Sequence, residues 1–281
     1  MKYFFIVLLA IFCFFSTNAY SSSTSEYLDN GYFVNATAAD LKSKISKKQI
    51  DPKFKTPRNV SLLAIAAIVS KNLDVLNVLM DAGIDVNALD ELGNTALQYS
   101  ISKEDPKRSL EVLKLLMKAG AKIDIKNKRG STPLHLAAGI MNKEYIEILV
   151  NAGADINTQT LQGRSVLMNA IENKAEKEVI YYLIAKGADV NTEDKYGSTA
   201  LILALEHYPD IDIINALIKA GADVNKGKDS DKRNTLMRAY FKLAPEDVIE
   251  LLIKSGADTA VKDRNGIDMK TYKLYWEQKM K

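Results

Sequence analysis

The chain of 281 residues contains a single cysteine, Cys13. Cys13 lies inside an N-terminal apolar run that we expect to be removed, which would leave the remaining chain without a thiol. Such a chain forms no disulfide bond and offers no thiolate ligand to a metal ion. A lack of free cysteine is also compatible with an oxidising compartment.

Histidine is nearly as scarce, because only His135 and His207 occur. A lone imidazole without a partner motif defines neither a reaction nor a metal site. The aspartates recur at a regular spacing, which indicates turn hydrogen bonds rather than paired acid–base groups. We therefore expect no catalytic residue, metal, cofactor or small-molecule substrate, and we expect the protein not to be an enzyme.

The chain has little net charge of either sign, at +3 at pH 7. Loss of the segment that contains Lys2 would leave +2. The many lysines are dispersed along the chain, so neither a polybasic membrane anchor nor a nucleic-acid partner is expected.

The first residues have the pattern of an export signal. Lys2 precedes a continuous apolar stretch over residues 3–15, and Thr17 and Ala19 then stand at the −3 and −1 positions of a cut before Tyr20. We expect residues 1–19 to be a signal peptide and the protein to be periplasmic or secreted. The length of an apolar stretch distinguishes a cleaved signal peptide from an uncleaved membrane anchor only weakly. An uncleaved membrane anchor is therefore the alternative.

A Ser-rich polar stretch follows the signal, and residues 20–36 are expected to form a flexible tether because they bury little apolar surface. Residues 37–57 are expected to form an N-terminal capping helix or degenerate repeat. Thr37 is placed to cap that helix, with Asp40 three residues later and Leu41 and Ile45 on one face.

From there one pattern recurs to the end of the chain. Glycines in phase are separated by 37, 33, 34, 34 and 35 residues, at Gly83, Gly120, Gly153, Gly187, Gly221 and Gly256. A period in this range is typical of stacked repeat units. Each unit contains two short stretches with apolar faces that can be buried only against neighbouring units.

These motifs resemble the ankyrin repeat. Residues 131–138 (STPLHLAA) match the family's opening of the first helix, and residues 153–157 (GADIN) match its closing turn. The resemblance covers roughly residues 51–265. It implies an all-α solenoid of stacked helix-turn-helix units with β-turn fingers, in which His135 serves structural hydrogen bonding.

The phase of the glycines predicts about six repeats over residues 58–263, followed by a C-terminal cap over residues 264–281. The predicted repeats cover residues 58–90, 91–127, 128–160, 161–194, 195–228 and 229–263. Tyr272 and Trp276 are expected to pack inward from the cap. Two caps and no additional apolar face favour a monomer.

In such arrays partners usually dock on the concave face made by the fingers and the first helices. The predicted binding residues are Leu89, Leu92, Lys128, Arg129, Leu161, Gln162, Lys195, Tyr196 and His207. Apolar residues at fingertips indicate an interface, although packing of the leucines against adjacent fingers is the open alternative. We expect Arg129, Leu161 and Tyr196 to lie at the centre, since Tyr and Arg are enriched at binding hot spots.

The sequence thus predicts a non-catalytic scaffold for protein–protein interaction, exported to the periplasm or the cell exterior. The low-cysteine, Lys- and Asn-rich composition favours a bacterial source. The alternative is a membrane-anchored structural or assembly component that keeps its N-terminal apolar segment. The partner protein is not identified by the sequence, because a fold does not fix a function.

Overall fold

The computed structural model describes residues 31–207, 209–228 and 231–280. The chain divides into two compact units, residues 1–128 and 129–281. Across the described residues every named element is an α-helix, and the β-structure there consists of isolated bridges. The prediction of an all-α fold is therefore confirmed.

Helices follow one another in pairs in both units. The first unit contains α3 (Tyr32–Asn35), α4 (Ala38–Ser46), α5 (Leu62–Val69), α6 (Asp74–Asp81), α7 (Ala96–Tyr99) and α8 (Pro106–Lys118). The second contains α9 (Pro133–Ile140), α10 (Lys143–Asn151), α11 (Val166–Glu172), α12 (Lys177–Ala185), α13 (Ala200–His207), α14 (Ile211–Lys219), α15 (Thr235–Phe241), α16 (Glu246–Lys254) and α17 (Met269–Met280).

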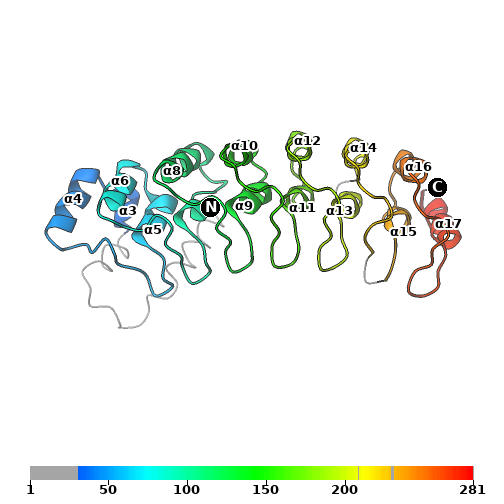
Figure 1. Cartoon of the computed structure of the whole chain (residues 1–281), viewed down its shortest axis with the longest axis horizontal. Helices are drawn as coiled ribbons and strands as arrows, with labels where there is room; N and C mark the ends of the chain where they lie inside the picture. Colours follow the sequence, from blue (N-terminus) through cyan, green and yellow to red (C-terminus); the bar gives the residue numbers. More distant parts are fainter. Residues whose placement is uncertain (1–30, 208, 229–230, 281) are drawn as a thin grey trace. The chain divides into compact units, whose positions relative to one another are not determined.

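Within each unit the helices stand in two rows (Figure 1). In the second unit α9, α11, α13, α15 and α17 form the row of first helices, and α10, α12, α14 and α16 form the row of second helices. Each loop that leads from a second helix to the next first helix projects away from the second-helix row, and we call such a loop a finger. Each predicted repeat interval contains one helix pair.

The pair α9–α10 illustrates why these segments are helical. Thr132 stands at the N-cap of α9, where its hydroxyl accepts the His135 N–H, and Pro133 occupies the first turn without loss of a hydrogen bond. The buried side chains then recur at helical spacing, at Leu134, Ala137 and Ala138 in α9 and at Tyr145, Ile146 and Leu149 in α10. Helices this short are marginal alone, so burial against neighbouring helices stabilises them.

The packed part of the chain begins earlier than the sequence predicted. Residues 20–36 were assigned to a tether, yet Tyr32–Asn35 forms α3, and Phe33 is buried in a helix that packs on α5. The isolated apolar pair at Phe33 and Val34 gave no periodic signal. The next helix is as predicted, because the Thr37 hydroxyl accepts the Asp40 N–H at the N-terminus of α4.

Residues 103–105 lead into α8, the second helix of its pair. Asp105 caps α8 by accepting the Arg108 N–H, and Pro106 occupies the first turn. The Arg108 guanidinium then donates to the carbonyl oxygens at the C-terminal end of α5, those of Ala66, Ala67, Ile68 and Ser70. A cation that binds the open carbonyls of a helix end also complements the helix dipole.

We expect Arg108→Ala to lower the free energy of unfolding of the first unit by about 2–3 kcal/mol, because several charge-assisted hydrogen bonds are lost together. Urea denaturation monitored by circular dichroism measures the change. Lys107→Ala, at the exposed neighbouring position, is the matched control. Arg108→Lys should be nearly as damaging as alanine, since one ammonium cannot reach all four carbonyls; wild-type stability in that variant would contradict the assignment.

Each finger is closed by a tight turn with a left-handed residue. In the finger over residues 194–198, the Asp194 N–H donates to the Ser198 carbonyl and the Gly197 N–H donates to the Asp194 carbonyl, both at 3.0 Å. Gly197 has φ 77°, a conformation that costs little only for glycine. Lys195 and Tyr196 precede this glycine and project at the end of the loop; we call such a residue pair a tip.

Neighbouring fingers are joined by backbone hydrogen bonds at the tips. In the second unit, the Leu161 N–H donates to the Arg129 carbonyl and the Lys195 N–H donates to the Gln162 carbonyl, both at 2.9 Å. In the first unit, the Lys128 N–H donates to the Leu92 carbonyl at 2.8 Å. This tip ladder uses main-chain atoms only, so it does not depend on which side chains the tips carry.

Asparagine side chains add a second link between successive pairs. The Asn157 amide donates to the Gly187 carbonyl at 3.1 Å, and its oxygen accepts the Asp189 N–H at 2.8 Å. Asn191 makes the same two bonds one pair later. The sequence motif identified these asparagines as part of the closing turn but did not reveal that they bridge to the next pair.

The second unit ends in α17, which covers α15. The Tyr272 hydroxyl donates to the Asp263 carboxylate at 2.8 Å, and the Trp276 indole N–H donates to the Ala244 carbonyl at 2.9 Å. The Trp276 ring also meets the Tyr240 ring edge-on, with centroids 6.0 Å apart. Tyr272 and Trp276 therefore both pack inward from the cap.

Acid should weaken this cap. Burial opposes ionisation of Asp263, but the Ile267 N–H, the Tyr272 hydroxyl and the Asn265 N–H outweigh it and lower the pKa of the carboxyl below its ordinary 3.8. The unfolded chain then binds the proton more tightly, so this stabilisation is present above pH 3.8 and is lost as the pH falls through the lowered pKa.

We therefore expect the urea concentration at the unfolding midpoint of the second unit to decrease as the pH is lowered from about 5 to about 2. Asp263→Asn should reduce that dependence, whereas Glu250→Gln on the exposed side of α16 should leave it unchanged. An identical pH profile in Asp263→Asn and wild type would contradict the assignment.

Candidate protein-binding surface

The apolar side chains predicted for the binding surface point into solvent. Their exposed fractions are 44% for Leu89, 58% for Leu92, 59% for Leu161 and 65% for Tyr196. The alternative, in which the leucines pack against adjacent fingers, does not describe Leu92 or Leu161, because each of these residues is more than half exposed. Exposed apolar groups on successive tips are typical of a docking surface.

In the first unit the predicted residues Leu89, Leu92 and Lys128 stand on two successive fingers. The Leu89 carbonyl accepts a 2.8 Å hydrogen bond from the Asn59 amide, which fixes the backbone before the tip. The Leu92 carbonyl accepts the Lys128 N–H. These backbone contacts hold the loops while the side chains of all three residues remain exposed.

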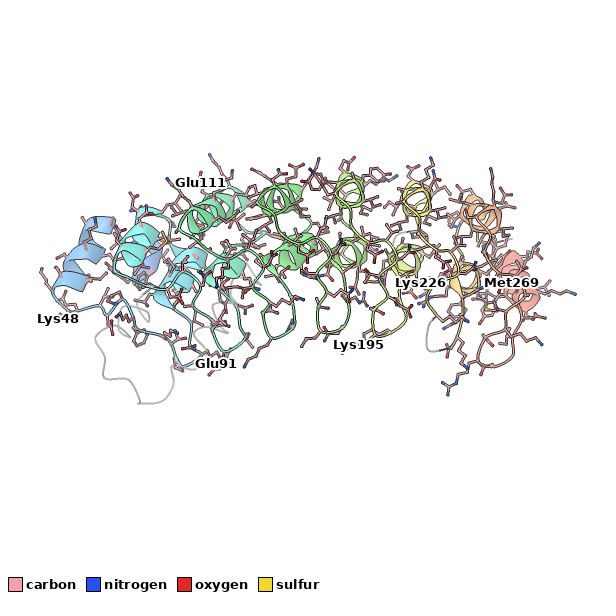
Figure 2. The ribbon with its side chains drawn as sticks, viewed as in Figure 1. Lys48, Glu91, Glu111, Lys195, Lys226 and Met269 are labelled. Atoms are coloured by element: carbon pink, nitrogen blue, oxygen red, sulfur yellow. The ribbon has the colours of Figure 1, made fainter. Side chains whose placement is uncertain are left out.

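In the second unit the structure brings five predicted residues together. Arg129, Leu161, Gln162, Lys195 and Tyr196 occupy three successive tips that the ladder connects, and all five side chains are exposed. Figure 2 shows Lys195 at the end of its loop, on the side away from the second helices. The three residues predicted as the centre, Arg129, Leu161 and Tyr196, belong to this group.

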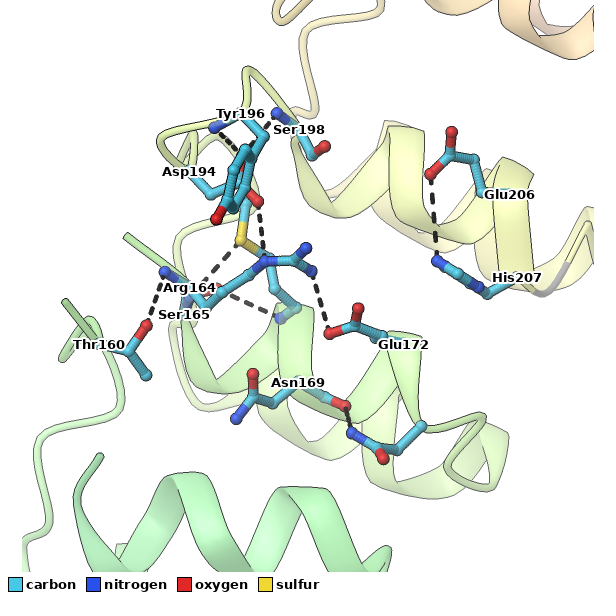
Figure 3. Close-up of polar contacts among 12 residues, drawn as sticks. Thr160, Arg164, Ser165, Asn169, Glu172, Asp194, Tyr196, Ser198, Glu206 and His207 are labelled. Carbon is cyan, nitrogen blue, oxygen red and sulfur yellow. Dashed lines mark hydrogen bonds and ion pairs between the residues drawn. The ribbon is translucent and has the colours of Figure 1, made fainter. Parts of the chain in front are cut away.

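His207 does not join the tips. It is the last residue of α13, whose first turn adjoins the finger, so about 10 Å of helix separates it from the finger end. Figure 3 shows His207 and Glu206 at the end of their helix remote from Tyr196. The His207 Nε2 atom lies 4.0 Å from the Glu206 carboxylate. The repeat period correctly assigned His207 to the first helix of its pair, but it gave no distance between His207 and the fingers.

An ion-pair network lies directly behind the tips (Figure 3). The Asp194 carboxylate is inaccessible to solvent, accepts the N–H groups of Tyr196 and Ser198 at 2.9 and 2.8 Å, and lies 2.8 Å from the Arg164 Nε atom. Arg164 also contacts Glu172 at 3.0 Å. The network therefore holds the Lys195–Tyr196 turn from beneath.

A second pair joins the next two first helices, where Arg238 on α15 contacts Glu206 on α13. Burial lowers the pKa of the Arg238 guanidinium, and the nearby Asp194 carboxylate partly opposes that shift. Sequence analysis missed both arginines as partners of acids, because the paired residues are about one repeat apart and no motif marks them.

Comparison with protein families gives one match. A model for ankyrin repeats, described as three copies, matches residues 36–127, 104–194 and 167–263. The chain belongs to the ankyrin-repeat family. A search of curated proteins gave no match. The family assignment accounts for the helix pairs and fingers of both units, and the fold is that of an ankyrin solenoid.

The hydrogen bonds of His135 confirm its predicted structural role. The Thr132 N–H donates to His135 Nδ1 at 3.3 Å, and His135 Nε2 lies 3.1 Å from the Arg164 carbonyl. Nδ1 therefore accepts and Nε2–H donates, which is the neutral tautomer. The imidazole connects the start of its own first helix to the following finger and is buried in that position.

Ankyrin repeats are generally modules of protein–protein interaction, and the family is typically non-catalytic. Over residues 31–207, 209–228 and 231–280, no group of three or more His, Cys, Asp or Glu side chains is arranged to hold a metal ion. Of the helices in these ranges, none has the length and apolar character needed to cross a membrane.

Proposed function

We propose that this ankyrin-repeat protein is an exported, non-catalytic and monomeric scaffold that binds a partner protein on its finger and first-helix surface. The observation that carries the proposal is the exposure of Leu161 and Tyr196 on neighbouring tips of the second unit. A backbone ladder and a buried ion pair fix these tips, so binding would cost little ordering of the loops.

The proposed contact residues follow the tips of both units. Leu89, Leu92 and Lys128 contribute from the first unit, and Arg129, Leu161, Gln162, Lys195 and Tyr196 contribute from the second. His207 would lie at the margin of the surface, at the remote end of α13. Export is supported by the apolar run and the small residues that follow it, which lie outside the described residues.

Replacement of Arg129, Leu161 and Tyr196 together by alanine is expected to abolish partner capture and to leave the helical circular dichroism spectrum unchanged. The side chains are exposed, so their loss removes contacts with a partner without opening a cavity. The matched control replaces Lys186, Glu250 and Ile253, which are exposed residues of the second-helix row. Unchanged capture by the tip variant, or an equal loss in the control, would overturn the proposed surface.

Export and partner binding are tested together on native protein isolated gently from fractionated source cells. Mass spectrometry of its N-terminus and of its companions should give a start at Tyr20 and one stoichiometric companion protein. An intact Met1 in the membrane fraction without a companion would instead support the membrane-anchored structural component.

A further inference from the structure

Gly139 lies inside α9, where neither the backbone nor the packing requires a glycine. It is not among the glycines with positive φ, and the left-handed residue that ends α9 is Met141. Among the described residues, a Cβ added at Gly139 would meet no atom within 4 Å beyond its own helix. Glycine is also one of the least favourable residues in a helix, because it leaves the unfolded backbone most free. The fold therefore gives no reason for this glycine.

The position that Gly139 occupies faces the finger of its own repeat. Arg164 precedes the N-cap of α11, and its guanidinium lies 3.0 Å from Glu172, the seventh residue after that cap (Figure 3). Arg233 precedes the N-cap of α15, and its guanidinium carbon lies 4.4 Å from the ring centroid of Phe241, again the seventh residue. Gly139 is the seventh residue after the N-cap of α9. In α11 and α15 an arginine thus covers the place that glycine holds in α9.

The α9 repeat leaves this place uncovered. The residue before its N-cap is Ser131, which is too short to reach position 139 as the arginines do. Leu136, one turn before Gly139, and Ile140, next to it, are apolar and half-buried. Leu203, which corresponds to Leu136 in α13, is only 1% exposed. Leu136, Gly139 and Ile140 thus form an open apolar stretch, which we call the α9 strip.

The surroundings of the α9 strip favour an uncharged occupant. The strip has no ionisable side chain, and on the neighbouring helix α11 the Arg164 and Glu172 side chains pair with each other. A charged group placed on the strip would lose solvation without gaining a partner there. The strip also continues the proposed binding surface, because the finger that leads into α9 carries Arg129. A protein bound at the tips can therefore extend onto it.

We infer that the partner inserts one large apolar side chain, aromatic or branched aliphatic, against Gly139 between Leu136 and Ile140. This inference rests on the proposed function and adds a specificity-determining residue to it. A glycine lets another chain approach a helix closely, and large side chains that become desolvated at the centre of an interface carry much of the binding energy. In the complex, the partner would fill the room that a side chain at position 139 would otherwise take.

Substitution of Gly139 separates this role from a structural one, because the two roles predict opposite changes in stability. Gly139→Ala should raise the urea concentration at the unfolding midpoint of the second unit, since alanine favours the helix and its Cβ enters open space. Gly139→Met should also fold, because methionine is a good helix former. A lower midpoint in Gly139→Ala would show that the glycine serves the fold and would overturn the inference.

Binding is measured with random peptides displayed on phage, selected on the wild-type chain and counter-selected on Gly139→Met. The enriched peptides should share one large apolar residue, and its replacement by alanine should abolish binding. Gly139→Met should bind these peptides at least about tenfold more weakly than the wild type, because its side chain takes the place of theirs. In nuclear magnetic resonance spectra, the bound peptide should shift the methyl signals of Leu136 and Ile140.

The matched control is Ala185→Met, which adds the same bulk at an exposed position of α12 and should bind the peptides as the wild type does. Failure to find a peptide that discriminates against Gly139→Met, enrichment without a shared apolar residue, or equal loss in the control would each refute the inference. Peptides that bind the wild type and Gly139→Met equally, but not the variant with Arg129, Leu161 and Tyr196 replaced, would retain the proposed function and refute the role of the α9 strip.

Discussion

Gly130→Ala should destabilise the second unit by about 4 kcal/mol or more, whereas Gly153→Ala should cost only about 1–2 kcal/mol. Both glycines have positive φ, at 77° and 92°, so both variants carry the penalty of a left-handed alanine. A Cβ on Gly153 would meet no atom within 4 Å. A Cβ on Gly130 would lie 2.5 Å from the Leu161 nitrogen and 2.9 Å from the Thr160 carbonyl carbon.

Both overlaps at Gly130 are with the backbone of the next finger, so no side chain can move aside to relieve them. The variant should break the tip hydrogen bond between the Leu161 N–H and the Arg129 carbonyl. Urea denaturation measures the cost, and hydrogen exchange at Leu161 tests the local opening. Equal destabilisation by the two substitutions would show that finger contact contributes nothing at this position.

Arg164→Met should lower the free energy of unfolding of the second unit by about 3 kcal/mol, because it leaves a buried carboxylate without its cation. The Asp194 side chain is inaccessible, whereas 19% of the Arg164 side chain is exposed, which places the expected cost at the lower end for buried pairs. Methionine keeps the apolar stem of arginine, so the loss of packing is small.

The double variant Arg164→Met, Asp194→Asn should recover most of the lost stability. Asparagine removes the charge but keeps an oxygen that can accept the Tyr196 and Ser198 N–H groups. A double-mutant cycle from urea denaturation gives the coupling between the two residues. Strict additivity of the single effects would mean that the ion pair does not stabilise the turn.

Repeat phase and local capping made most of the fold predictable. Glycines that recur near every 34 residues locate the helix pairs, and Thr37 and Thr132 show their capping role in the sequence itself. Contacts that do not recur with the repeat period left no pattern in the sequence from which they could be predicted. Arg108 reaches carbonyls about 40 residues earlier, and Arg164 pairs with an aspartate one finger later. Such contacts become visible only when the backbone is in place.

The candidate surface was likewise predictable only in part. Leu92, Leu161 and Tyr196 were predicted because they are apolar residues at fingertips, and the structure places their side chains in solvent. His207 was included because it ends a first helix, but sequence phase carries no information on how far a helix end lies from a finger. The engagement of Asp194 and Asp263 was also hidden, because each depends on a partner from another element.

The tip ladder has an evolutionary consequence. Its hydrogen bonds run between main-chain atoms, so a mutation at Lys195 or Leu161 can alter what the surface recognises without removing a bond that holds the fingers together. Stability and recognition are therefore encoded by different atoms of the same residues. A lineage could exchange one target for another by drift at these positions, and a laboratory library randomised there would retain a folded scaffold while sampling new specificities.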